Sequence, residues 1–197
     1  MLILDELQNI AEADLIYTET LMQRGKEDYS GKEICILGGG DGALLYELLK
    51  ENPKHVVMLE IDDLVMEACN KYMSSICGDV LEVRKRENYE IIIGDCMVWL
   101  DKYIKDGKKF DYVFGDLTDI PISDTPTGEI WDFIRTILEA SFKVLKADGW
   151  DFVGLPCSLP WLTFFRLQKI HDSWQRCQLP GISWNVWRAI EEINANR

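Results

Sequence analysis

From about residue 32 onward, short apolar runs alternate regularly with longer amphipathic stretches, and this alternation constrains the fold more than any other feature. Continuous apolar runs are typical of strands buried on both faces, and the longer stretches have helical periodicity. Strands are predicted at residues 34–37, 55–61, 89–93 and 110–114. Helices are predicted up to about residue 51 and over about 63–73, 97–105 and 130–146.

Strands that alternate with helices build βαβ units, and the crossovers between parallel strands are right-handed. The chain of 197 residues has the length of one ordinary domain. The pattern therefore predicts an α/β fold with a Rossmann-like, doubly wound and mostly parallel sheet.

The composition changes beyond Gly149, where the α/β pattern ends. Five of the seven tryptophans and three of the six prolines stand in the last 48 residues. We therefore predict a Rossmann-like domain over residues 17–149 and a tryptophan-rich tail over residues 150–197.

The chain is strongly acidic, with 21 lysines and arginines against 34 aspartates and glutamates and a formal net charge of −13. Binding to the phosphates of a nucleic acid needs a basic face, which this balance disfavours. We therefore expect no nucleic-acid partner and favour a cationic one.

The six cysteines include no CxxC pair, and the chain has two histidines. This excludes zinc-finger spacing, and scattered thiols are typical of a reducing compartment. The N-terminus is acidic where a signal peptide would be basic, and no apolar run is long enough to span a bilayer. We expect a cytoplasmic protein with neither a metal ion nor a membrane partner.

Four acidic residues follow the carboxyl ends of the four predicted strands, where ligands of doubly wound sheets bind: Asp41, Glu60, Asp95 and Asp116. The first belongs to a glycine-rich run, Gly38–Gly42, that allows a tight turn and a close approach to a ligand. Glu60 follows Asp41 by 60 − 41 = 19 residues. This is the usual place for a carboxylate that binds both hydroxyls of a ribose.

Each of these features also has a purely structural explanation. The glycine run can be a strand-to-helix turn, Glu60 an exposed strand end, Asp95 a helix cap and Asp116 a loop residue. Tyr17 can belong to the core, and Cys96 can be a small packed side chain. Four acids at matching strand ends are harder to explain in this way together.

Several carboxylates at one site are costly unless cations neutralise them. The expected ligands are therefore a positively charged nucleoside and a second, cationic substrate. A dinucleotide such as NAD fits poorly, because Asp41 stands where its pyrophosphate would bind.

The motifs that carry the acids resemble those of the polyamine aminopropyltransferase family, over about residues 2–149. They are Asp14–Glu19, Ile36–Gly42, Leu59–Asp62, Gly94–Cys96 and Phe110–Thr118. Within that family, the segments that resemble spermine synthases are Lys26–Tyr29, Asp116–Thr118 and Pro121–Ser123.

The resemblance implies transfer of an aminopropyl group from decarboxylated S-adenosylmethionine, a co-substrate and not a permanently bound cofactor. The acceptor would be a cationic polyamine, spermidine, and the products spermine and 5′-methylthioadenosine. The alternatives are a spermidine synthase that acts on putrescine and an inactive scaffold that binds a full-length relative.

The resemblance also assigns roles to individual residues. Asp116 would accept a proton from the attacking amine, and Tyr17 would contact the polyamine. The donor would be bound by Gly38 and Gly40 in the turn, by Asp41 at its ammonium, by Glu60 at its ribose, and by Asp95 with Cys96 beside its adenine.

Members of the family carry an N-terminal β-stranded domain, and spermine synthases add a dimerising domain before it. Residues 1–16 are expected to be a remnant of that region, supplying one strand and a turn. Residues 150–197 diverge from the family pattern, so the sheet edge is expected to be incomplete. A homodimer is possible in the family, but its dimerising domain is absent from this sequence.

Overall fold

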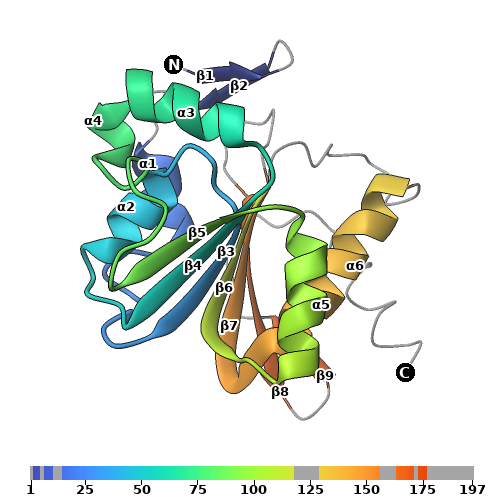
Figure 1. The fold of residues 1–197 in the computed structure, drawn as a ribbon. Coiled ribbons are helices and arrows are strands. Elements are labelled where there is room, and N and C mark those ends of the chain that lie inside the picture. The colour runs from blue at the N-terminus through green and yellow to red at the C-terminus, as the bar shows by residue number, and fades with distance from the viewer. Residues whose placement is uncertain are drawn as a thin grey trace.

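The computed structural model describes residues 2–4, 7–10, 15–117, 129–155, 163–170 and 173–176. Its centre is a sheet of seven strands in the order β5-β4-β3-β6-β7-β8-β9 (Figure 1). The strands are β3 (Glu33–Gly38), β4 (His55–Glu60), β5 (Tyr89–Ile93), β6 (Phe110–Asp116), β7 (Leu145–Leu155), β8 (Thr163–Ile170) and β9 (Ser173–Arg176).

The sheet is mostly parallel. Strands β3 to β7 pair in parallel, whereas β8 and β9 join in antiparallel fashion. The chain runs outward from β3 through β4 to β5, and then returns to the other side of β3 with β6. The predicted Rossmann-like α/β sheet is confirmed, and its topological switch point lies between β3 and β6.

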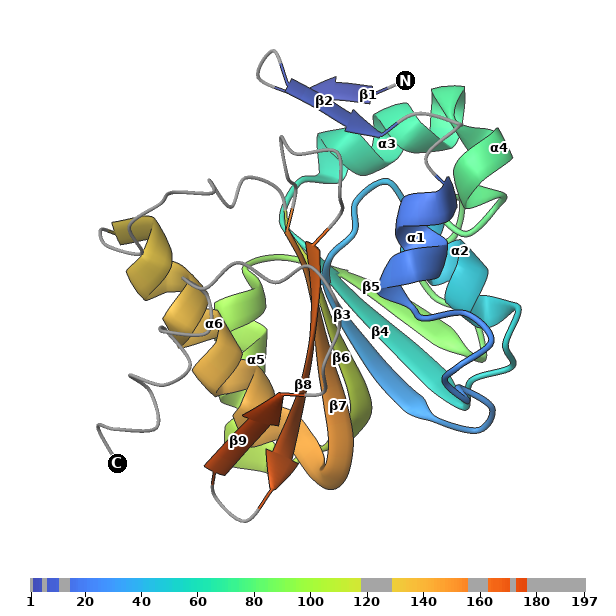
Figure 2. The same cartoon turned by 180° about the vertical axis from the view of Figure 1, so that it is seen from behind.

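Helices cover both faces of the sheet (Figures 1 and 2). One face carries α1 (Leu15–Leu21), α2 (Ala43–Leu49), α3 (Asp63–Tyr72) and α4 (Ser74–Cys77). The other face carries α5 (Cys96–Asp106) and α6 (Glu129–Val144).

Alternate residues of the central strands enter two different cores, as the pleat of a strand requires. On β3, Ile34 and Ile36 pack in the cluster that includes Leu44 of α2. Cys35 and Leu37 pack in the cluster that includes α5 and α6. Because both faces are buried, these strands read as continuous apolar runs.

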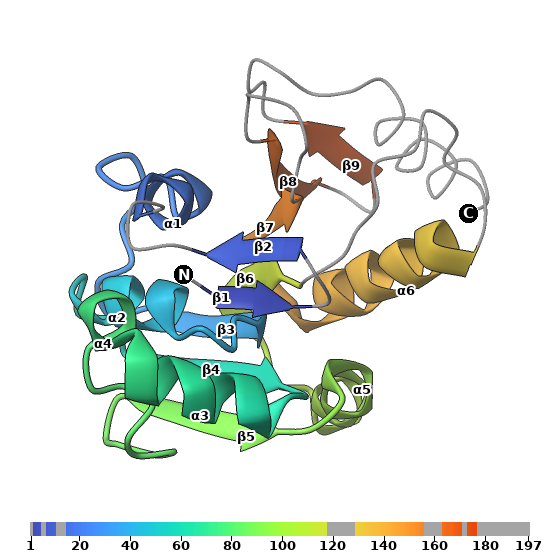
Figure 3. The same cartoon turned by 90° about the horizontal axis from the view of Figure 1, so that it is seen from above.

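The N-terminal segment and the tail differ from the sequence-based expectation. Residues 1–16 were expected to supply one strand and a turn, but β1 (Leu2–Leu4) and β2 (Leu7–Ile10) form an antiparallel pair. This pair lies above the sheet in Figure 1 and crosses its centre in the view from above (Figure 3). At the edge expected to be incomplete, β8 and β9 continue the sheet beyond β7.

Among the helices in the described ranges, none combines the length and the apolar character that crossing a membrane requires.

Candidate active site

The glycine turn after β3 holds the end of β6. Gly38 and Gly39 have φ values of +84° and +79°, in the left-handed region that favours glycine. A Cβ atom on Gly38 would lie 2.2 Å from the carbonyl oxygen of Asp116. The backbone N–H of Gly39 donates to that same oxygen at 3.0 Å. The two strands of the switch point can therefore meet only because side chains are missing from the turn.

The same turn makes room for Glu60, at the end of β4. A Cβ atom on Gly40 would lie 2.8 Å from Glu60 Oε2. Glu60 is buried, and its Oε1 accepts a hydrogen bond from the backbone N–H of Asp62 at 2.8 Å. Burial raises the pKa of Glu60, while backbone N–H groups that include that of Gly40 act in the opposite direction. Glu60 is therefore not the exposed strand end that the structural alternative supposed.

Asp41 lies between the turn and α2. Its Oδ1 accepts a hydrogen bond from the backbone N–H of Ala43 at 2.7 Å. Burial raises the pKa of Asp41, the Ala43 N–H lowers it, and the charge of Glu60 raises it again. The net direction is upward, mainly because of burial, and the nearby charge of Glu60 adds to it.

Asp116 ends β6 and completes this acidic cluster, which we define as Asp41, Glu60 and Asp116. Burial, followed by the charge of Asp41, raises the pKa of Asp116 to about 7. Glu60 acts in the same direction with a smaller effect, and a hydrogen bond from Tyr17 opposes it. A carboxyl group with a pKa near neutrality is suited to exchange a proton at the pH of a cell.

Tyr17 reaches this cluster from α1, 99 residues away from Asp116 in the sequence. Its hydroxyl donates to Asp116 Oδ1 at 3.1 Å. Burial, and then the charge of Asp116, raises the pKa of Tyr17 well above its ordinary value. The phenol therefore stays protonated and acts as a hydrogen-bond donor to the carboxylate.

Asp95 and Cys96 lie one strand further out, at the end of β5. Asp95 is exposed, and its Oδ1 accepts from the backbone N–H of Met97 at 2.8 Å, so it caps α5 as the structural alternative supposed. Burial raises the pKa of the Cys96 thiol to about 11, which keeps it neutral. The backbone N–H of Gly94 donates to the carbonyl oxygen of Glu60 at 2.8 Å and ties this end to β4.

The structure therefore brings together Tyr17, the glycine turn and the acidic cluster, while Asp95 caps a neighbouring helix. Sequence reasoning placed Gly39 in the turn but singled out only Gly38 and Gly40, and it did not predict that the Gly39 N–H donates to the Asp116 carbonyl oxygen. The three consecutive glycines were the available signal for Gly39, because a turn with one left-handed residue would need only one glycine.

In the part of the chain that the structure describes, the acidic cluster forms no ion pair with a lysine, arginine or histidine. No group of side chains that could hold a metal ion was found among the same residues. Since carboxylates that lie close together disfavour one another's ionisation, a cationic ligand would stabilise a site of this kind.

Fold and side chains together define an α/β protein whose candidate ligand site is acidic and lies at the switch point of a Rossmann-like sheet. The family described as "Spermine/spermidine synthase domain" matches residues 14–175, which is most of the chain. The chain belongs to the spermine/spermidine synthase family. The match continues past residue 149, where the resemblance was expected to end.

Curated relatives carry the name polyamine aminopropyltransferase. The protein from Pyrobaculum aerophilum is 35% identical over 158 residues, which are 77% of this chain and 53% of the relative. The protein from Sulfurisphaera tokodaii is 38% identical over 145 residues, which are 69% of this chain and 46% of the relative. The chain thus spans about half the length of these relatives.

Solved structures give the same result. A spermidine synthase from Thermotoga maritima matches 72% of this chain and 43% of its own, with a TM-score of 0.53 and 25% identity. A spermidine synthase in complex with the transition-state analogue AdoDATO matches 72% of this chain and 45% of its own, with a TM-score of 0.54 and 27% identity.

Proposed function

We propose that this protein is a polyamine aminopropyltransferase that moves the aminopropyl group of decarboxylated S-adenosylmethionine onto spermidine. The observation that carries the proposal is the acidic cluster at the switch point, which forms no ion pair among the described residues, with the Tyr17 hydroxyl 3.1 Å from Asp116 Oδ1. Family membership supports aminopropyl transfer, since relatives are named polyamine aminopropyltransferase.

The donor is bound through groups at the carboxyl ends of β3 to β5. Glu60 accepts hydrogen bonds from the ribose hydroxyls, beside the space that Gly40 leaves open. Asp41 attracts the ammonium of the aminopropyl chain. Asp95 and Cys96 lie towards the adenine. Because the decarboxylated donor lacks a carboxylate, an aspartate can stand at position 41 without repelling it.

The transfer itself is a substitution at carbon. The lone pair of the acceptor amine attacks the aminopropyl carbon that is bonded to the sulfonium. The C–S bond breaks, its electron pair stays on sulfur, and 5′-methylthioadenosine leaves. The proton lost by the attacking nitrogen passes to Asp116, while the Tyr17 hydroxyl holds Asp116 Oδ1 in place.

Proton transfer is the part of this reaction for which the site is suited. If the acceptor amine has a pKa of about 10, as lysine does, freeing its lone pair at pH 7 costs roughly 4 kcal/mol. Asp116 must be ionised to accept the proton. Bound cations favour its ionised form, so substrate binding lowers the pKa from the value of about 7 in the empty site.

Three segments, Lys26–Tyr29, Asp116–Thr118 and Pro121–Ser123, favour spermidine over putrescine as acceptor by resemblance to spermine synthases. Residues 118–123 lie outside the described residues. In the segment Lys26–Tyr29, Tyr29 is buried, and Glu27 Oε2 accepts a hydrogen bond from the hydroxyl of Tyr112 at 3.2 Å. The runner-up is a spermidine synthase that uses putrescine, because the matched solved structures carry that name.

The test is to incubate the chain with decarboxylated S-adenosylmethionine and either spermidine or putrescine, and to quantify polyamines and 5′-methylthioadenosine by chromatography. Spermine and 5′-methylthioadenosine in equal amounts support the proposal. Spermidine formed from putrescine supports the runner-up. If neither acceptor is consumed and calorimetry shows no donor binding, the protein is a scaffold and the proposal is wrong.

A further inference from the structure

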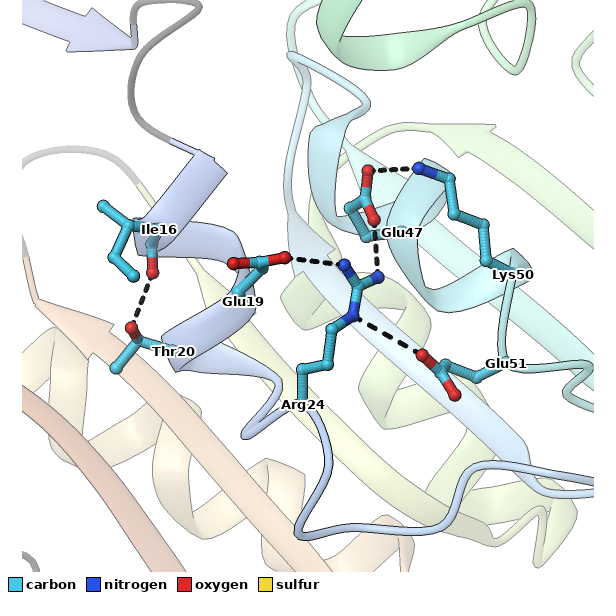
Figure 4. Close-up of polar contacts among 7 residues, drawn as sticks. All are labelled: Ile16, Glu19, Thr20, Arg24, Glu47, Lys50 and Glu51. Atoms are coloured by element: carbon cyan, nitrogen blue, oxygen red, sulfur yellow. Dashed lines mark hydrogen bonds and ion pairs between the residues drawn. The ribbon is translucent and has the colours of Figure 1, made fainter.

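Arg24 lies at the centre of a charged group that joins helix α1 to helix α2 (Figure 4). Its Nη1 donates to Glu19 Oε1 on α1 at 2.8 Å, and its Nη2 donates to Glu47 Oε2 on α2 at 2.5 Å. Its Nε lies 3.5 Å from Glu51 Oε1, just beyond α2. One guanidinium therefore contacts side chains from both helices in a fixed, forked geometry.

Glu47 is the buried end of this group. Its side chain is only 4% exposed, and it also accepts a hydrogen bond from Lys50 Nζ at 2.6 Å. Burial raises the pKa of Glu47, but the hydrogen bonds from Lys50 and Arg24 hold it below its ordinary value. A buried carboxylate that needs its partners in place is a directional anchor, because removing one partner leaves its charge poorly compensated.

Helix α1 needs an anchor of this kind. It has seven residues, and helices shorter than about 12 residues are marginal when isolated. Leu21 packs into the cluster that includes Leu44 and Leu45. The buried side chains of α1 are few, Thr18 and Leu21, so a forked ion pair adds directional restraint on its rotation that non-directional apolar packing supplies only weakly.

The rotation of α1 matters because the helix carries Tyr17, two residues before Glu19. The Tyr17 hydroxyl must reach Asp116 Oδ1, which it does at 3.1 Å. Helix α2 begins directly after Asp41 and Gly42. Arg24 therefore links the helix that carries Tyr17 to the helix that follows Asp41.

We propose that Arg24 is a positioning residue for the candidate active site: its ion pairs with Glu19 and Glu47 hold α1 in the rotation that brings Tyr17 to Asp116. The consequence for turnover rests on the proposed function, whereas the positioning itself does not.

The charge state of Asp116 reports this positioning. Asp116 faces Tyr17 from α1, Asp41 from the glycine turn and Glu60 from β4. Burial and the two carboxylates raise its pKa, and the hydrogen bond from Tyr17 lowers it. Loss of that hydrogen bond raises the pKa of Asp116 further.

The test is an NMR titration of the Asp116 side-chain carboxyl carbon in Arg24→Met, Tyr17→Phe and the double variant, with the signal assigned by its absence in Asp116→Asn. Both single variants are expected to raise the pKa of Asp116. The double variant is expected to match Tyr17→Phe, because Arg24 acts through Tyr17. Arg24→Lys keeps the positive charge but not the forked geometry of the guanidinium. We therefore expect it to raise the pKa of Asp116 by less than Arg24→Met does.

Glu47→Ala separates positioning from a direct effect of charge. It removes a negative charge, so a through-space effect would lower the pKa of Asp116, whereas release of the anchor raises it. The matched control is Lys146→Met. That lysine bridges Asp111 and Glu33 at 2.8 Å and 3.3 Å, near the opposite ends of the strands. Its loss is expected to leave the pKa of Asp116 unchanged.

An Asp116 pKa in Arg24→Met equal to that of the parent overturns the proposal. The proposal is also overturned if Arg24→Met raises the pKa of Asp116 by the same amount in the Tyr17→Phe variant as in the parent. Failure of the proposed function is separate, because the titration requires no turnover. If the parent protein makes no product but the variants show the expected Asp116 pKa shifts, the positioning role of Arg24 stands. If the parent is active but the variants lack these shifts, the positioning role is wrong.

Discussion

At the scale of single residues, Asp116 combines two properties that oppose each other. Its burial and the nearby Asp41 disfavour its negative charge, and Tyr17 favours it. The outcome is a carboxyl group whose pKa lies near 7, so that modest changes in its surroundings switch its protonation.

Replacing Asp116 by asparagine separates binding from chemistry. The amide keeps the shape of the side chain but cannot accept a proton. We expect Asp116→Asn to lower kcat by about 10²- to 10⁴-fold, the usual contribution of a general base. Donor affinity, measured by calorimetry, is expected to be retained. Turnover equal to that of the parent would contradict the role assigned to Asp116.

Two glycines of the turn are expected to respond differently to alanine. Gly38→Ala places a Cβ atom 2.2 Å from the Asp116 carbonyl oxygen at a φ of +84°, so it strains the backbone and destabilises the fold. Gly40→Ala places its Cβ 2.8 Å from Glu60 Oε2, an atom that can move. We expect Gly40→Ala to lose donor affinity with a smaller loss of stability.

Calorimetry of donor binding and urea denaturation of both variants check this prediction. Equal losses of stability in Gly38→Ala and Gly40→Ala would contradict the expectation that a clash with backbone atoms costs more than a clash with the Glu60 side chain.

At the scale of elements, the sequence predicted the parts whose pattern is repeated locally. The run at 89–93 coincides with β5, and the predicted strand at 55–61 matches β4 (His55–Glu60) within one residue. Helix α1 was not predicted, because seven residues are too short for a clear helical period and a helix of this length relies on tertiary packing, here of Leu21 against the core. The hairpin pair β1 and β2 was predicted only as one strand and a turn.

The site was predictable to the same degree. The carboxyl ends of parallel strands converge, so the sequence alone indicated that Asp41, Glu60 and Asp116 lie close together. Asp95 could not be decided, because a helix cap and a ligand-binding carboxylate have the same local sequence. The contact of Tyr17 with Asp116 spans 99 residues and was not predicted; the family resemblance named Tyr17 only as a contact of the polyamine.

Helix α5 allows the contributions of a buried and an exposed helix face to the free energy of unfolding to be compared. Leu100 is fully buried against the sheet, whereas Val98, two residues earlier, is 65% exposed. Leu100→Ala is expected to lower the free energy of unfolding by about 2–5 kcal/mol, the usual cost of this change in a core. Val98→Ala is expected to have little effect in the same urea titration. Equal effects would contradict the assigned packing of α5.

At the scale of the whole molecule, the acidic cluster makes folding stability depend on pH. Asp116 stays protonated in the folded chain up to a pH of about 7, against an ordinary pKa of 3.8. Between these values the unfolded chain has released a proton that the folded chain retains, so stability falls as pH rises through this window. The raised pKa values of Asp41 and Glu60 act in the same direction.

We therefore expect Asp116→Asn to be more stable than the parent at pH 8, and the gain to be smaller at pH 5. Thermal unfolding of both proteins at the two pH values measures the difference. A stabilisation of equal size at both pH values would show that charge is not its cause.

Asp41, Glu60 and Asp116 lie together with no ion pair to any of them among the described residues, and we propose that a cationic ligand neutralises them. The most direct measurement is the NMR titration of the Asp116 carboxyl carbon in the parent chain, with and without decarboxylated S-adenosylmethionine. We predict a pKa near 7 in the free chain, in agreement with the buried geometry, and a lower value once the donor is bound. An ordinary pKa near 4 that the donor leaves unchanged would contradict the account.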